Sequence, residues 1–132
     1  MILKRRKTLY PKKKSPKKSR KALVDKLDSI LSHITRNNAN GICEVCGKAG
    51  SQVHHFFSKK VHSAVRWDED NLISICFFCH IIKIHRQVDI EDAREALIHR
   101  IGEQRFSDLK TRAHEIKKVT LQDIEELIEK YK

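Results

Sequence analysis

Cys43-Glu-Val-Cys46 and Cys76-Phe-Phe-Cys79-His80 are the stretches that decide the fold of this 132-residue chain. Each contains two cysteines with two residues between them, and twenty-nine residues separate the two pairs. One such pair can curl around an ion, and two pairs give the all-thiolate tetrahedral shell of a structural zinc. The alternative, two disulfides in a secreted protein, has no apolar signal segment to support it. We therefore predict that the four cysteines bind structural Zn²⁺.

Polar groups suited to chemistry gather between the two cysteine pairs. His54 and His55 are adjacent, Asn71 follows, and His80 comes directly after the last cysteine. A lone pair of histidines usually lies on the surface without a role, but clustered titratable groups between two metal-binding stretches indicate a functional site. The residue pattern predicts short strands over residues 52–57 and 71–76, and a helix that begins near residue 77.

This combination of Cys-x-x-Cys, His-His, Asn-Leu and Cys-x-x-Cys-His resembles the HNH endonucleases, the ββα-metal class. More narrowly, His55-Phe-Phe-Ser-Lys-Lys60 and Arg66-Trp-Asp-Glu-Asp-Asn71 resemble the phage NinG/Rap recombination endonucleases, as do residues 97–106 and 120–131. The likeness covers residues 22–132. The sequence departs from the family at His54, where a small residue is common, and at His80, where Asn is common, and both changes supply metal ligands.

The resemblance implies an α+β fold, in which helices flank a small zinc-stabilised HNH ββα-metal core behind a basic N-terminal tail. It also implies metal-dependent hydrolysis of DNA phosphodiesters. In that chemistry His55 is the general base, Asn71 orients the loop and His55, and His54 and His80 hold a catalytic Mg²⁺ or Mn²⁺. The narrower likeness implies recombination on branched or junction DNA, in the cytoplasm of a bacterial host.

His85 is a further candidate ligand for the catalytic ion. Many enzymes of the HNH class carry a second histidine four residues after the first one on this helix, where this chain has Ile84. Five residues at about 100° each place His85 about 140° from His80 around an α-helix. His85 can therefore face the ion only if a π-bulge intervenes.

The net charge of +11 lies in one segment. Residues 1–21 hold eleven basic residues and no acid, whereas the rest of the chain is neutral in sum. Such a segment buries little surface and commonly binds polyanions, although a merely solvated tail is the simpler alternative. It lacks the apolar face of a membrane-surface helix, and no run of eighteen apolar residues is present, so no membrane partner is expected. The predicted DNA contacts are Lys12, Lys13, Lys14, Lys17, Lys18, Lys59, Lys60 and Arg66.

The sequence predicts one domain over residues 22–132, preceded by a flexible tail over residues 1–21. Apolar periodicity predicts a helix at 22–38, the zinc and ββα-metal core occupies 43–88, and further helices follow within 89–132. Asp89 and Thr120 are expected to cap helices. Gly47 and Gly50 are expected in tight turns that need a positive φ.

Two alternatives to a recombination nuclease stay open. An HNH nuclease for homing, packaging or restriction would cut a defined duplex sequence rather than a junction. A non-catalytic zinc-finger module that binds DNA or RNA would not need His54, His55, Asn71 and His80 in register. Paired cuts on a junction would suit a two-fold homodimer, and the C-terminal helices could supply its interface.

Removal of residues 1–21 is expected to weaken DNA binding and to flatten its salt dependence, because fewer counterions are released when fewer cations contact phosphate. Titrations of a labelled duplex at several salt concentrations measure this slope. An unchanged slope would show that the tail takes no part in binding.

Overall fold

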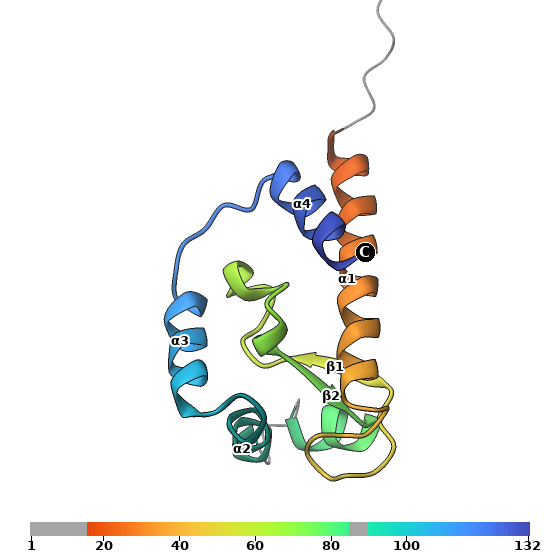
Figure 1. The fold of residues 1–132 in the computed structure, drawn as a ribbon, viewed down its shortest axis with the longest axis vertical. Coiled ribbons are helices and arrows are strands. Elements are labelled where there is room, and N and C mark those ends of the chain that lie inside the picture. Colours follow the sequence, from red (N-terminus) through yellow and green to blue (C-terminus); the bar gives the residue numbers. More distant parts are fainter. Residues whose placement is uncertain (1–15, 85–89) are drawn as a thin grey trace, which may run out of the picture.

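The structure is a computed structural model that describes residues 16–84 and 90–132. It is a mixed α+β arrangement in which helices surround one two-stranded sheet (Figure 1). In chain order the elements are α1 (Pro16–Asn38), β1 (Gln52–His55), the 3₁₀ turns η1 (Ser63–Val65) and η2 (Glu69–Asn71), β2 (Leu72–Ile75), the π-helix η3 (Phe78–Ile84), α2 (Ile90–Ile101), α3 (Glu103–Ala113) and α4 (Leu121–Tyr131). No helix within these described ranges is both long and apolar enough to cross a membrane.

The sheet is an antiparallel hairpin in which Gln52 pairs with Ile75 and His55 pairs with Leu72. Both strands are shorter than the sequence predicted, by two residues in β1 and by one at each end of β2. Beyond the end of β1, the Phe56 amide still donates to the Asn71 carbonyl at 2.9 Å. The two strands therefore remain joined up to the point where the loop begins.

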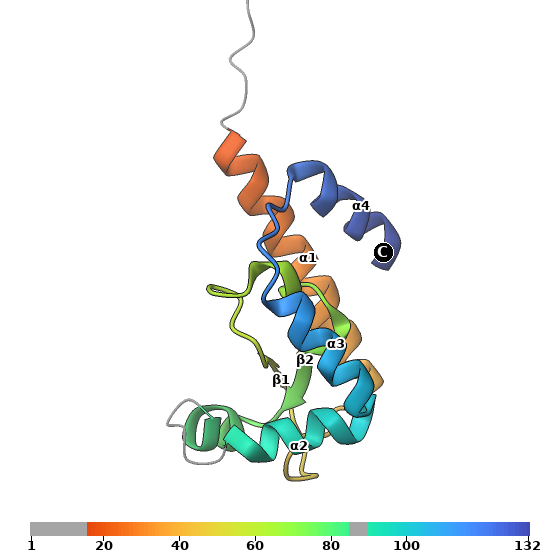
Figure 2. The ribbon, with the colours of Figure 1, turned by 90° about the vertical axis from the view of Figure 1, so that its left-hand side faces the viewer.

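Strand β2 lies between two hydrophobic clusters and is buried along its whole length. Ile73 and Ile75 face one cluster, which α2 and α3 complete through Leu97, Phe106 and Leu109. The opposite cluster is completed by α1 and α4, and its buried members are Leu27, Leu31, Trp67, Leu72, Ile124 and Ile128. Figures 1 and 2 show the result, with the hairpin between α1 on one side and the α2–α3 pair on the other.

Helix α1 begins six residues earlier than the sequence analysis predicted. The expected start was residue 22, with a tail that Pro16 interrupted, whereas Pro16 is the first residue of the helix. Proline suits the first helical position because its φ is preset and its missing amide would have had no partner there. Lys17 and Lys18 therefore belong to α1, and a truncation that preserves this helix must end at residue 15. Lys12, Lys13 and Lys14 lie outside the described residues.

The C-terminal helices α2, α3 and α4 lie within residues 89–132, as the apolar periodicity predicted. Thr120 caps α4 in a capping box: its hydroxyl accepts from the Asp123 amide at 3.2 Å, and the Asp123 carboxylate accepts from the Thr120 amide at 2.9 Å. Asp89, the other predicted cap, lies outside the described residues.

Gly50 is needed for a different reason from the one the sequence suggested. Gly47 has the expected positive φ of 77°, but Gly50 does not have a positive φ. A Cβ on Gly50 would instead lie 2.9 Å from the Cys43 amide nitrogen and 3.0 Å from the Ile75 carbonyl carbon. Gly50 thus allows the backbone around the first cysteine pair to approach β2 closely.

We predict that Gly50→Ala lowers the free energy of unfolding by about 1–3 kcal/mol, because the added methyl group meets backbone atoms that must shift. The matched control is Ser51→Ala at the exposed neighbouring position, which should change it by less than about 0.5 kcal/mol. Urea denaturation of the zinc-loaded proteins measures both. Equal stability of the two variants would mean that the backbone relaxes without cost.

Candidate functional site

The four cysteine thiols form one compact group. All four Sγ atoms lie within 4.8 Å of one another, and Cys46 Sγ lies 3.7 Å from Cys76 Sγ. Tetrahedral zinc with Zn–S bonds of about 2.3 Å would separate its sulfur ligands by about 3.8 Å. The cluster therefore has the size and the donor set to hold a metal ion such as Zn²⁺.

Backbone amides turn each cysteine pair around this centre. The Cys46 amide approaches Cys43 Sγ at 3.5 Å, and the Cys79 amide approaches Cys76 Sγ at 3.4 Å. These contacts favour the thiolate form, and the Cys79 amide lowers the pKa of Cys76 to about 7. Burial has the opposite effect on Cys79 and raises its pKa. A bound cation would offset that cost, because metal ligation requires the thiolate.

Glu44 fastens the first cysteine pair to β2. Its amide donates to the Ser74 carbonyl at 2.9 Å, and its carboxylate accepts from the Ser74 amide at 2.8 Å. Arg100 of α2 closes the group with an ion pair to Glu44 at 3.0 Å. Strand β2, which ends directly before the second cysteine pair, is thus also bonded to the first pair through Glu44.

His55 stands at the end of β1 with its two ring nitrogens in different roles. Nε2 lies 3.0 Å from the Arg66 carbonyl oxygen. Because a carbonyl oxygen only accepts, this contact assigns the proton to Nε2 and the lone pair to Nδ1. Burial lowers the pKa of His55, which the hydrogen bond to the Arg66 carbonyl partly opposes. At neutral pH the ring is therefore uncharged, and Nδ1 can accept a proton.

Asn71 is fully buried and closes the loop between the strands. Its Oδ1 accepts from the Phe57 amide at 2.7 Å, while its Nδ2 donates to the carbonyls of Phe57 at 3.0 Å and Val65 at 3.1 Å. Val65 directly precedes Arg66, whose carbonyl meets His55. The Asn71 side chain thus fixes both the start of the loop and the segment that orients His55.

His54 and His80 lie beside each other, with an edge-to-face ring contact and centroids 5.1 Å apart. Gln52 Oε1 lies 2.7 Å from His80 Nδ1, which assigns the proton to Nδ1 and the lone pair to Nε2. Adjacent strand residues normally face opposite sides. His54 and His55 nevertheless share one cleft, since β1 ends at His55.

That cleft has a volume of about 420 Å³ and is lined by Val53, His54, His55, Ser58, Lys59, Lys60 and His80. The structure therefore brings together the three histidines and the two lysines that the sequence analysis selected. Asn71 lies behind the cleft as a scaffold. The site combines a neutral imidazole acceptor, a pair of imidazoles and two ammonium groups, a set suited to a phosphate group and a metal ion.

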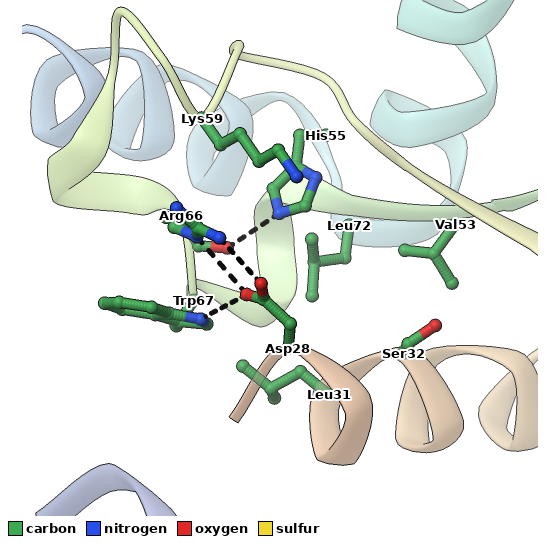
Figure 3. A pocket seen from close by; sticks show the side chains of 9 residues that line it. All are labelled: Asp28, Leu31, Ser32, Val53, His55, Lys59, Arg66, Trp67 and Leu72. Atoms are coloured by element: carbon green, nitrogen blue, oxygen red, sulfur yellow. Dashed lines mark hydrogen bonds and ion pairs between the residues drawn. The ribbon is translucent and has the colours of Figure 1, made fainter. Parts of the chain in front are cut away.

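Arg66 is placed differently from the other predicted DNA contacts. Its guanidinium donates to both carboxylate oxygens of Asp28, at 3.2 and 2.6 Å (Figure 3). Arg66 is not among the residues that line the cleft of the three histidines. Its backbone carbonyl, rather than its side chain, reaches the site through His55. The reason is that Asp28, on α1, offers the guanidinium a bidentate partner in a partly buried position.

His85 itself lies outside the described residues. The segment before it, η3, is a π-helix. His85 could face the ion only if the helix departed from α-helical geometry in this way.

Three residues that matter to this site were missed by the sequence analysis: Asp28, Glu44 and Gln52. Each acts on a partner 28 to 38 residues away along the chain. Carboxylate and amide side chains at such separations carry no local pattern. Only Gln52, two residues before His54 on the predicted strand, had a position that could have drawn attention.

The family model described as "Bacteriophage Lambda NinG protein" matches residues 3–132. Searches of curated proteins and of solved structures gave no match.

We predict that Cys43→Ser loses stoichiometric zinc and lowers the thermal midpoint by roughly 10 °C or more, because metal binding contributes directly to folding. A chelator should reproduce the effect in the unchanged protein. Metal analysis and thermal denaturation measure it, with Lys48→Ala, at an exposed position in the same turn, as the control. A Cys43→Ser protein with normal zinc content and midpoint would contradict the assignment of this thiol as a ligand.

Proposed function

This chain belongs to the bacteriophage lambda NinG family, and we propose that it is a metal-dependent DNA endonuclease of the HNH, ββα-metal type. The observation that carries the proposal is the arrangement of His55. Its Nε2 is bonded to a backbone carbonyl, its burial favours the neutral ring, and it lines a cleft with a histidine pair and two lysines. A module that only binds nucleic acid has no use for an imidazole held as a base.

In the proposed reaction, His55 Nδ1 removes a proton from the attacking water. The resulting imidazolium keeps its Nε2–H bond to the Arg66 carbonyl, a contact that strengthens as the ring becomes charged. Asn71 holds this carbonyl in place through the adjoining Val65 peptide. A base held in the right tautomer and orientation does not have to reorient during the reaction.

His54 and His80 would hold the catalytic ion, for which Mg²⁺ and Mn²⁺ are the candidates. The residues fit such an ion, because the two rings lie together in the cleft and the contact with Gln52 gives His80 Nε2 a lone pair. Nitrogen ligands favour Mn²⁺ over Mg²⁺, which prefers oxygen. When bound, the ion supplies Lewis-acid stabilisation of the charge that develops on the phosphate and the leaving oxygen.

DNA is the proposed partner, with Lys59 and Lys60 next to the scissile phosphate. Both side chains are exposed and line the cleft. Their ammonium groups would position the backbone without reading sequence. The NinG membership supports a role in phage recombination, and from it we further propose branched DNA as the preferred substrate, cut by a two-fold dimer in the cytoplasm of the host bacterium.

The test is cleavage of a four-way junction and of a matched linear duplex with Mg²⁺, Mn²⁺ or EDTA. His55→Ala is expected to cut roughly a hundred- to ten-thousand-fold more slowly, the usual contribution of a general base, while it keeps its fold, zinc and DNA affinity. His33→Ala, at an exposed position on α1, is the control and should cut normally.

The outcomes separate the parts of the proposal. Metal-dependent cutting that prefers the junction and requires His55 supports all of it. Equal cutting of both substrates supports the nuclease and removes the junction preference. An absence of cutting with every metal, while DNA binding persists, would overturn the nuclease and favour a binding module.

A further inference from the structure

Asp28 is a partly buried carboxylate on α1 that the proposed mechanism does not use. Its Oδ2 accepts from Arg66 at 2.6 Å, and its Oδ1 accepts from Arg66 at 3.2 Å and from the Trp67 indole at 2.7 Å (Figure 3). Burial opposes ionisation of this group, but the hydrogen bonds from Arg66 and Trp67 outweigh it and hold the pKa of Asp28 below its usual value. Asp28 is therefore a fixed anion at neutral pH.

The two side chains that Asp28 holds flank a single peptide bond. The carbonyl of that peptide belongs to Arg66 and accepts from His55 Nε2 at 3.0 Å. The preceding carbonyl, of Val65, is held separately by Asn71 at 3.1 Å and by the Asp68 amide at 3.2 Å. Asn71 thus holds the peptide before Arg66, and Asp28 binds the side chains on both sides of the peptide whose carbonyl contacts His55.

We propose that Asp28 is a positioning residue of the active site, through which α1 fixes the ring orientation and tautomer of His55 by way of Arg66 and Trp67. Its effect on catalysis rests on the proposed role of His55 as the general base. Its effect on the imidazole ring does not, and can be measured in a protein that cuts nothing.

The surroundings of His55 explain why loss of this carboxylate would matter. The loop cations Lys59 and Arg66 face His55, as does the anion Asp28 on α1, and Figure 3 shows all three around its ring. In Asp28→Asn, the Arg66 guanidinium loses its ion pair and one of the two oxygens that accept from it, because an amide keeps a single acceptor oxygen. A cavity of about 130 Å³, lined by Asp28, Ser32, His55 and Arg66 among others, adjoins this group. The Arg66–Trp67 segment therefore has room to change orientation and turn its carbonyl away from His55.

The apolar packing of α1 does not involve this carboxylate. Leu27 and Leu31, on either side of Asp28 along α1, are almost fully buried against α4 and β2. This apolar packing remains when Asp28 becomes Asn, a substitution of the same shape. The substitution is therefore expected to change the site more than the stability.

The experiment compares Asp28→Asn with Asp25→Asn, which removes an exposed carboxylate from the same helix. With the zinc-loaded protein and the DNA substrate that it cuts best, Asp28→Asn is expected to reduce kcat roughly ten- to a hundredfold, the cost of a misplaced catalytic group, with KM within about twofold. Asp25→Asn should match the wild type. In an Arg66→Met background, Asp28→Asn should cause a smaller further loss than it does in the wild type, because only the contact of Asp28 with Trp67 remains to be changed.

A second measurement is independent of activity. Long-range ¹H–¹⁵N spectra of the histidine rings show which nitrogen carries the proton. His55 should be a fixed Nε2–H tautomer in the wild type and in Asp25→Asn, and a mixture of tautomers in Asp28→Asn. If Asp28→Asn fails to fold, Trp67→Phe, which removes one donor to Asp28 and keeps an aromatic ring, should show a smaller shift in the same direction.

The outcomes distinguish this inference from the proposed function. A wild-type protein that cuts DNA, with normal kcat and an unchanged His55 tautomer in Asp28→Asn, would overturn the positioning role alone. A wild-type protein that cuts nothing would overturn the nuclease, and the ring spectra would then decide the role of Asp28. The positioning role would also be overturned if the fall in kcat caused by Asp28→Asn were fully additive with the fall caused by Arg66→Met. Asp28 would then act by a route that does not pass through Arg66.

Discussion

Four thiols within 4.8 Å of one another lie beside a short hairpin, and a metal ion bound by them would stabilise it. Two strands of four residues are too short to be stable in water without further support. The first cysteine pair is joined to the edge of β2 by the hydrogen bonds between Glu44 and Ser74. The second pair follows directly after the end of that strand. A metal ion in this cluster would join the two pairs and leave the hairpin little freedom. The two hydrophobic clusters then cover β2 from opposite sides.

The end of this hairpin at which the loop joins the two strands carries the candidate site. His54 and His55 lie where β1 stops, and Asn71 holds the loop that follows at Phe57 and at Val65. Asp28 adds a third attachment from α1. The proposed base is therefore surrounded by groups from α1 and from the loop, although the cleft is lined by residues from the hairpin, the loop and η3.

Local chemistry explains what was predictable from the sequence and where it erred. The amphipathic stripes predicted the helices, and residue types that favour strands predicted both strands to within two residues. The start of α1 was wrong, because Pro16 was treated as a helix breaker although proline is favoured at the first helical position. Gly50 was predicted to have a positive φ, whereas its role is to avoid contact with Cys43 and Ile75.

The sequence by itself determined the four-cysteine group, the helices and the small set of polar residues from which a site could be built. Spacings of two to four residues report these features, because metal ligation and helical periodicity are local. Only the tertiary structure decided that the Arg66 guanidinium turns to Asp28, while the Arg66 carbonyl meets His55. It likewise decided that Gln52 sets the tautomer of His80. Such contacts join residues that lie far apart in the chain, and they exist only once the two clusters have packed α1 and η3 against the same hairpin.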